Sequence, residues 1–104
     1  MKESLIITTV CQELDYRERL GQCVYIRNNS GAIKIENRFF RFGKKGSADL
    51  LLFLPNGRTI FLEAKSDKGQ LTENQKTFNK KISKLGYDYI IIKNPNDISH
   101  LFKK

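Results

Sequence analysis

The chain is short and strongly basic. It has 104 residues, with 19 Lys and Arg against 11 Asp and Glu, so its formal net charge is +8 at pH 7. This length predicts one domain over residues 1–104 with a modest core. The positive charge favours a polyanionic partner such as nucleic acid, although an ordinary well-charged surface also explains it.

The sequence disfavours a membrane protein, a secreted protein and a cysteine-based site. No stretch reaches the roughly 18 consecutive apolar residues that span a membrane, and acidic residues interrupt the N-terminal segment where a signal peptide is apolar. We therefore expect no membrane association and a cytoplasmic location. Cys11 and Cys23 lie in apolar segments without a second Cys pair or a neighbouring His, which predicts buried thiols rather than a disulfide or metal site.

The first expected element is an amphipathic helix over residues 2–20. Its apolar side chains recur at helical spacing, so one face of the helix is apolar. These side chains are Ile6, Ile7, Val10, Cys11 and Leu14.

Strands are expected next. Residues 23–28 (CVYIRN) and 32–36 (AIKIE) flank a turn cluster and together suggest a hairpin, and residues 39–42 (FFRF) form a third short strand. Phe39, Phe40 and Tyr87 sit among apolar neighbours, so we expect them in the core rather than as stacking platforms for bases. The loop at 43–46 holds Lys44 and Lys45, which are either solvated charges or a phosphate site.

The second half of the chain alternates strands and helices. Residues 50–54 and 60–62 are apolar on both faces, which is typical of strands in the middle of a covered sheet. Residues 71–86 predict a helix with Phe78, Ile82 and Leu85 facing inward, 87–93 a further strand, and Asp97 the cap of a short last helix. The order predicts an α/β fold with a mixed central β-sheet flanked by helices.

Three charged residues surround the two apolar strands. If residues 55–57 (PNG) form a three-residue loop, counting back along both strands places Asp49 opposite Glu63. Because side chains alternate between faces, Asp49, Glu63 and Lys65 then share one face of the sheet. Directly opposed Cβ atoms lie roughly 4.5 to 5.5 Å apart, so both carboxylates can reach one ion.

This arrangement indicates metal chemistry. Two close carboxylates against an apolar sheet repel one another, so without a cation at least one should take up a proton. Mg²⁺ or Mn²⁺ would relieve the repulsion, because both prefer oxygen ligands. Lys65 could then orient or help deprotonate an attacking water, or neutralise charge on a phosphate. The alternative is a capping Asp49 beside a peripheral Glu63–Lys65 ion pair.

Two stretches, GSADLLLF and FLEAKSDKGQLTENQ, carry a family pattern. They resemble the PD-(D/E)XK nuclease superfamily and, within it, the VRR-NUC (virus-type replication-repair nuclease) domains. Those domains have a glycine just before the metal-binding Asp, an E-x-K on the next strand, and G-x-L-[ST]-x-x-Q opening the following helix. Residues 27–31 (RNNSG) fit the family's R-x-N-S-G hairpin, whereas Ala48 stands where the superfamily's namesake proline often sits.

The resemblance implies a single, stand-alone domain with a restriction-endonuclease-like core in αβββαβ order. It also implies a divalent-metal-dependent DNA endonuclease in which Asp49, Glu63, the Ala64 carbonyl and a helical acid bind Mg²⁺ or Mn²⁺. Lys65 and Gln75 are then catalytic residues, and water attack leaves a 5′-phosphate.

Two of these assignments have alternatives in the sequence. The helical acid is Glu3 or Glu13, and we favour Glu3 because it opens the helix as the family's acid does. Gln75 also completes a capping box with Thr72, in which its side chain reaches back to the backbone amide of Thr72. On resemblance alone we place Gln75 beside the active site.

The resemblance also suggests a substrate and a partner. Stand-alone members of this size resemble homodimeric Holliday-junction resolvases of phage or bacteria, so we expect branched DNA, a homodimer, no small-molecule cofactor, and the cytoplasm of a bacterial or phage-infected cell. Alternatives are a nuclease for flaps, nicks or ends, and a non-catalytic nucleic-acid-binding module. Candidate contacts to the phosphate backbone are Arg27, Lys44, Lys45, Lys68, Lys76 and Lys80.

Overall fold

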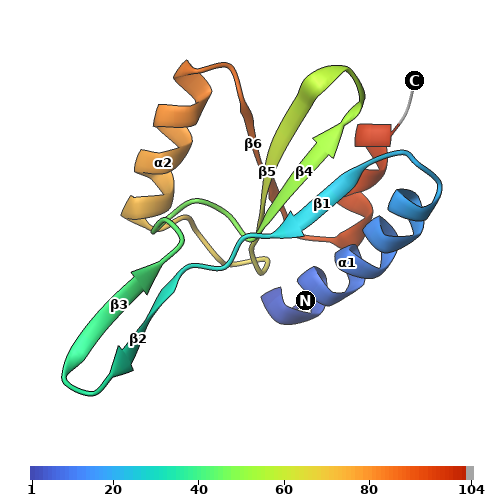
Figure 1. Ribbon diagram of the computed structural model, residues 1–104. Helices are drawn as coiled ribbons and strands as arrows, with labels where there is room; N and C mark the ends of the chain where they lie inside the picture. The colour runs from blue at the N-terminus through green and yellow to red at the C-terminus, as the bar shows by residue number, and fades with distance from the viewer. Residues whose placement is uncertain (103–104) are drawn as a thin grey trace.

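The computed structural model describes residues 1–102 and shows the predicted α/β fold (Figure 1). A mixed four-stranded sheet has the order β1-β4-β5-β6 and carries helices on both faces. β1 (Val24–Arg27), β4 (Leu50–Leu54) and β5 (Arg58–Ala64) are antiparallel neighbours, and β6 (Asp88–Ile92) pairs in parallel with β5. Among these residues, no helix combines the length and apolar character needed to cross a bilayer.

One face of the sheet packs against α1 (Glu3–Arg19) and the 3-10 helix η2 (Pro95–Phe102). The predicted helical stripe is confirmed, since four of its five apolar residues are buried and Cys11 packs against them half-buried. Cys23 is buried, and both cysteines are free. The sheet contributes Leu50, Leu52, Ile60 and Leu62, none of which is exposed. This face therefore holds the main hydrophobic core.

The other face is covered more thinly by α2 (Glu73–Lys84). The ring of Phe78 on this helix meets the ring of Phe61 on β5 edge to face, with 5.4 Å between centroids. Ile82 is buried, as predicted. The inward orientation predicted for Leu85 is wrong, because Leu85 is the C-cap residue of α2 and is 75% exposed.

The β4–β5 register confirms the three-residue loop. Pro55–Gly57 forms a single 3-10 turn in which Asn56 has a φ of 67°, and Leu54 pairs with Arg58. The ladder continues to Leu50 opposite Leu62, and the Asp49 N–H donates to the Leu62 carbonyl at 3.0 Å. Asp49 therefore lies across from Glu63, as counting along the strands predicts.

The predicted hairpin between residues 23–28 and 32–36 is wrong. β1 pairs with β4, while β2 (Gly31–Ile35) pairs with β3 (Arg38–Phe42) through a two-residue turn at 36–37. The cause lies at Asn28, whose backbone N–H donates to the Asp49 carbonyl and whose side-chain amide donates to Ser47 Oγ and the Ala48 carbonyl. These bonds tie Asn28 to the main sheet, so the chain leaves the sheet there instead of turning back.

We call residues 31–42 the arm, because they project from the body as a separate two-stranded ribbon (Figure 1). The chain extends 50 Å along its longest axis against 29 Å along the other two, and its radius of gyration of 14.6 Å exceeds the roughly 13 Å typical of this length. Phe39 and Phe40 lie on the arm and are 72% and 47% exposed, so their assignment to the core is wrong. The core assignment of Tyr87 is also wrong, because Tyr87 is 45% exposed, although its ring packs edge-on against Phe61.

The last helix begins earlier than a cap at Asp97 implies. Asn94 precedes Pro95 and accepts a hydrogen bond from the N–H of Asn96, which makes Asn94 the capping residue. The Asp97 carboxylate reaches back to the N–H groups of Lys93 and Asn94. Asp97 therefore supports the cap from inside the helix.

Candidate active site

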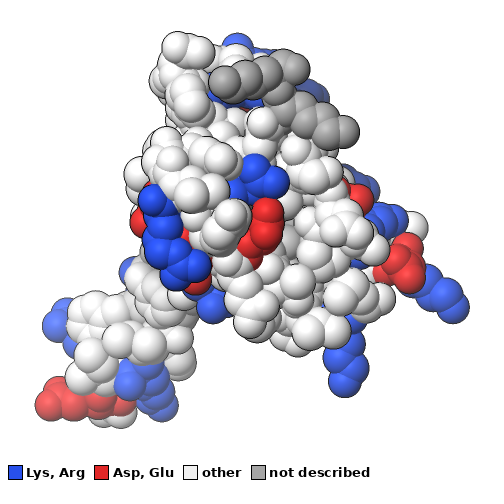
Figure 2. All heavy atoms as spheres, turned by 90° about the vertical axis from the view of Figure 1, so that its right-hand side faces the viewer, with Lys and Arg blue, Asp and Glu red and all other residues white. Residues whose placement is uncertain are grey.

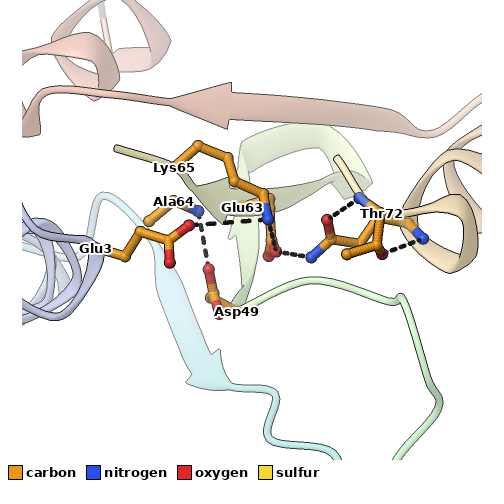
Figure 3. A network of polar contacts seen from close by, with 7 residues as sticks. Glu3, Asp49, Glu63, Ala64, Lys65 and Thr72 are labelled. Carbon is orange, nitrogen blue, oxygen red and sulfur yellow. Dashed lines mark hydrogen bonds and ion pairs between the residues drawn. The ribbon is translucent and has the colours of Figure 1, made fainter. Parts of the chain in front are cut away.

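The acidic pair lies where β4 begins and β5 ends (Figure 3). Asp49 Oδ2 accepts a hydrogen bond of 2.8 Å from the N–H of Ala64. Because the N–H and C=O of one strand residue point to the same side of the strand, the Ala64 carbonyl also faces the side on which Asp49 lies. Two side chains and one backbone carbonyl thus direct oxygen atoms toward one region.

Glu63 is a buried carboxyl group with a perturbed pKa. Its residue is 5% exposed, and its Oε1 accepts a hydrogen bond from Gln75 Nε2. Burial raises the pKa of Glu63 to about 8, with further increases from the hydrogen bond and the charge of Asp49, while Lys65 opposes the shift. Without a cation, the carboxyl therefore holds a proton near neutral pH, as expected of two crowded carboxylates.

Lys65 follows β5 directly and brings a buried positive charge to the pair. The residue is 8% exposed, and its Nζ lies 3.9 Å from Glu63 Oε1 and 3.8 Å from Glu3 Oε1. Its backbone N–H donates to the Ile92 carbonyl on β6, which fixes where the side chain emerges. The amine is thus held between two acids from different elements.

Of the two candidate helical acids, the structure places Glu3 at the site. Glu3 lies in the first turn of α1, and its carboxylate approaches Lys65. Glu13 lies farther along the helix, where its carboxylate pairs with Arg17 Nε at 2.9 Å. Its carboxylate is therefore engaged at the helix surface, and Glu13 does not line the cavity of the site.

Gln75 serves both of the functions that the sequence presents as alternatives. The Thr72 side chain accepts from the Gln75 N–H at 3.2 Å, and Gln75 Oε1 accepts from the Thr72 N–H at 2.9 Å, which completes a capping box. The other end of the same amide, Nε2, donates to Glu63. The amide oxygen of Gln75 stabilises the helix start, while its amide nitrogen holds the carboxyl of Glu63.

These residues line a cavity of about 310 Å³. Arg27, at the end of β1, lies on its wall, so one of the six predicted phosphate contacts belongs to the site itself. The complete lining is Glu3, Ser4, Ile7, Arg27, Asp49, Glu63, Ala64, Lys65 and Gln75.

Sequence reasoning did not single out Tyr89, on β6. Its hydroxyl is buried and has no hydrogen-bond partner among residues 1–102. Burial raises the pKa of Tyr89, and the charges of Glu63 and Asp49 raise it further, so this ring lies within electrostatic reach of the acidic pair. A bound water is the usual partner of such a group. Tyr89 lies in a strand of mostly apolar residues, so the sequence pattern gave no sign that its ring lies near the acidic pair.

A second cavity, of about 230 Å³, is basic. Lys44 and Lys45 from the loop meet Lys81 from α2 there, and none of the three lysines forms an ion pair within the described part of the chain. Gly46 allows the loop to lie close to the start of α2, because its φ is +84° and an added Cβ would lie 2.4 Å from the Asn74 carbonyl oxygen. The helical pattern alone did not distinguish Lys81 from the other lysines of α2. We call this cavity the lysine pocket.

The other predicted contacts do not join the lysine pocket. Lys76 pairs with Glu73 at 3.3 Å. Lys68 and Lys80 are absent from the linings of both the cavity at the acidic pair and the lysine pocket. Figure 2 shows blue side chains spread over several parts of one face rather than gathered in a single patch.

The acidic pair fits a divalent cation that prefers oxygen. Within residues 1–102, no group of three or more His, Cys, Asp or Glu side chains lies close enough to hold a metal, so Glu3 does not complete a triad with the pair. Mg²⁺ is commonly held by one or two carboxylates, with waters and substrate phosphates filling the remaining positions. A cation would also remove the cost of ionising the buried Glu63 beside Asp49.

Comparison with known proteins identifies the family and supports the fold. The model of the VRR-NUC domain family matches residues 3–94. A solved structure described as a VRR_NUC domain is similar in fold, with a TM-score of 0.64 and 20% identity over 95% of this chain and 91% of that chain. No curated protein matches the sequence. The family match covers most of the chain, which is therefore a member of the VRR-NUC family, nucleases of the PD-(D/E)XK type.

Proposed function

We propose that this protein is a metal-dependent, structure-specific DNA endonuclease that resolves four-way junctions. The observation that carries the proposal is the half-buried Asp49 beside the buried Glu63 and Lys65 at adjoining strand ends, with the pKa of Glu63 raised to about 8. A buried carboxyl with a strongly perturbed pKa beside a second acid and a lysine is typical of a catalytic site. The reaction is hydrolysis of a phosphodiester bond, with the 5′-phosphate left on one product.

The residues of the site have separable roles in this reaction. Asp49, Glu63 and the Ala64 carbonyl would hold Mg²⁺ or Mn²⁺, which when bound supplies positive charge against the phosphate. Lys65 orients the attacking water and stabilises negative charge that develops on the phosphate oxygens. Glu3 positions Lys65 through their ion pair, and Gln75 fixes the carboxyl of Glu63.

The basic residues suggest how DNA is bound. Arg27 stands at the catalytic cavity, and the loop that carries the lysine pocket runs from Lys44 directly into Asp49. Contacts of this kind bind phosphates and carry no sequence information. Recognition by the shape of branched DNA is therefore favoured over recognition of a base sequence. A phage or bacterial cytoplasm is the proposed setting.

The experiment that tests this function is cleavage of end-labelled four-way junction, flap and plain duplex by the purified protein with Mg²⁺ or Mn²⁺. Lys65→Ala is run beside wild type, with Lys84→Ala, an exposed lysine at the end of α2, as the matched control. We expect paired, symmetric nicks in the junction alone, lost in Lys65→Ala and retained in the control.

Other outcomes would change the proposal. Metal-dependent cutting of flap or duplex would keep the nuclease and replace the junction as its substrate. Binding of DNA without cutting of any substrate would refute the enzymatic role and favour a nucleic-acid-binding module.

A further inference from the structure

The two faces of the arm differ in charge and shape. In the β2–β3 register, Lys34 pairs with Phe39 and Ala32 with Arg41, and directly paired residues share a face. We call this face the cationic face of the arm. The large side chains of the opposite face are Ile33, Ile35, Arg38, Phe40 and Phe42. The single acid of the arm, Glu36, lies in the turn at its tip, and neither Lys34 nor Arg41 forms an ion pair within residues 1–102.

Phe39 presents its ring to solvent on the cationic face. It is 72% exposed, more than any other Phe or Tyr among residues 1–102. Lys34 Nζ lies 5.7 Å from the centre of the ring, so a positive charge accompanies the aromatic surface. Proteins that bind single-stranded nucleic acid combine these two groups, because bases stack on aromatic rings while cations follow the phosphate backbone.

A cavity of about 400 Å³ continues the cationic face toward the body of the protein (Figure 1). Its lining includes Ser30, Arg41 and Lys45. Lys45 also lines the lysine pocket, so the two cavities share one cation. The cationic face and the two cavities therefore form one path from Phe39 to α2, and the loop on this path leads directly into Asp49.

We propose that the cationic face of the arm binds a single strand of nucleic acid, with one unpaired base stacked on Phe39 and backbone phosphates along Arg41 and Lys45. The charge is complementary, because the cations of this face have no acidic partner in the chain and a polyanion supplies one. An intact duplex is a poorer occupant, since its bases are already stacked on one another. An acidic protein would satisfy the cations but leave the ring without a flat partner.

This surface deepens the proposed function, on which its biological use rests. Bases that are unpaired at a branch, a flap or a gap can stack on a protein ring without the cost of opening a base pair. An arm that holds such a strand would direct the active site to branched or partly opened DNA without reading its sequence. The binding itself requires neither metal nor cleavage, so failure of the surface and failure of the nuclease are distinguishable.

The test is fluorescence anisotropy of a labelled single-stranded oligothymidine of about 12 nucleotides, titrated with the full chain in EDTA. Phe39→Ala and Phe39→Leu should each raise the Kd about fivefold or more, which is the loss expected for one base–aromatic stack. Phe39→Tyr keeps a flat ring and should bind as wild type does. The Kd of a blunt duplex should be the same for wild type and all three variants.

The salt dependence of the Kd tests the path of the backbone. Arg41→Ala should reduce the slope of log Kd against log salt by about 0.7, the value for one phosphate contact to a single strand. Arg38→Ala is the matched control, because Arg38 lies on the same strand but on the opposite face of the arm. It should leave the slope unchanged.

Each outcome decides the proposal. Equal binding of the single strand by wild type and Phe39→Ala overturns it, and so does an equal loss in Phe39→Leu and Phe39→Tyr, because the loss would then not depend on a flat ring. Equal slopes for Arg41→Ala and Arg38→Ala would also overturn it. Circular dichroism of each variant should match wild type, since Phe39 lies outside the hydrophobic core.

Discussion

Replacing Glu63 by Gln should stabilise the metal-free protein at alkaline pH. The pKa of Glu63 rises from its ordinary value of 4.5 to about 8 in the folded chain, because the carboxyl is buried beside Asp49. A group whose folded pKa is raised keeps its full contribution to stability below its unfolded pKa. The contribution is lost as pH rises through the folded pKa, here between about 4.5 and about 8.

The magnitude follows from that shift. At 1.36 kcal/mol per pKa unit, the difference corresponds to a ceiling of about 5 kcal/mol. Part of this is recovered when the ionised side chain relaxes and water enters, so we take about 2 kcal/mol. For a domain of this size, that difference amounts to about 10 °C in Tm. The amide that the substitution introduces cannot ionise, and its oxygen can still accept the hydrogen bond from Gln75.

The assay is thermal unfolding followed by circular dichroism in EDTA from pH 5 to pH 9. The Tm of Glu63→Gln should match wild type at pH 5 and exceed it by about 10 °C at pH 8 to 9. Glu73→Gln, at an exposed carboxylate on α2, is the control and should follow wild type throughout. A difference in Tm between Glu63→Gln and wild type that stays constant from pH 5 to pH 9 would refute the buried, protonated carboxyl at Glu63.

Three further predictions test the site and the DNA contacts. Lys65→Ala should lower the cleavage rate about 100-fold or more while DNA affinity in Ca²⁺ stays the same, and an equal loss of affinity would contradict its assigned role. Gln75→Ala and Thr72→Ala should each cost about 1 kcal/mol through the capping box, but only Gln75→Ala should also impair cleavage; equal cleavage by the two would show that the contact with Glu63 is incidental. Lys81→Ala should reduce the slope of log Kd against log salt by about one, whereas the neighbouring Lys84→Ala should not, and equal slopes would remove the lysine pocket from the DNA path.

The elements that sequence predicts correctly depend on local rules. The three-residue loop at 55–57 and the alternation of side chains suffice to place Asp49 opposite Glu63, because both operate over adjacent strands. The apolar stripe of α1 is equally local. Glu3 can be favoured over Glu13 from its place at the start of the helix, and the structure brings it to Lys65.

The errors about the arm and the lysine pocket concern contacts between distant segments. The pairing of the arm is missed because the bonds from Asn28 to Ser47 and Ala48 join residues 19 and 20 positions apart, and no local pattern announces them. The wrong assignment of Phe39 to the core has the same cause, because an aromatic run is typical of a core strand unless the strand is known to leave the sheet. Lys81 joins the lysine pocket only because Gly46 lets the loop approach α2.

The most direct test of the account is the effect of metal on Tm at pH 8 for wild type and Asp49→Asn. Millimolar Mg²⁺ or Mn²⁺ should raise the Tm of wild type, because the ion binds the folded acidic pair and removes the penalty at Glu63. Asp49→Asn, whose amide oxygen can still accept the Ala64 N–H, should show no rise. An equal response of the two proteins, or none in wild type, would contradict a metal site at Asp49 and Glu63.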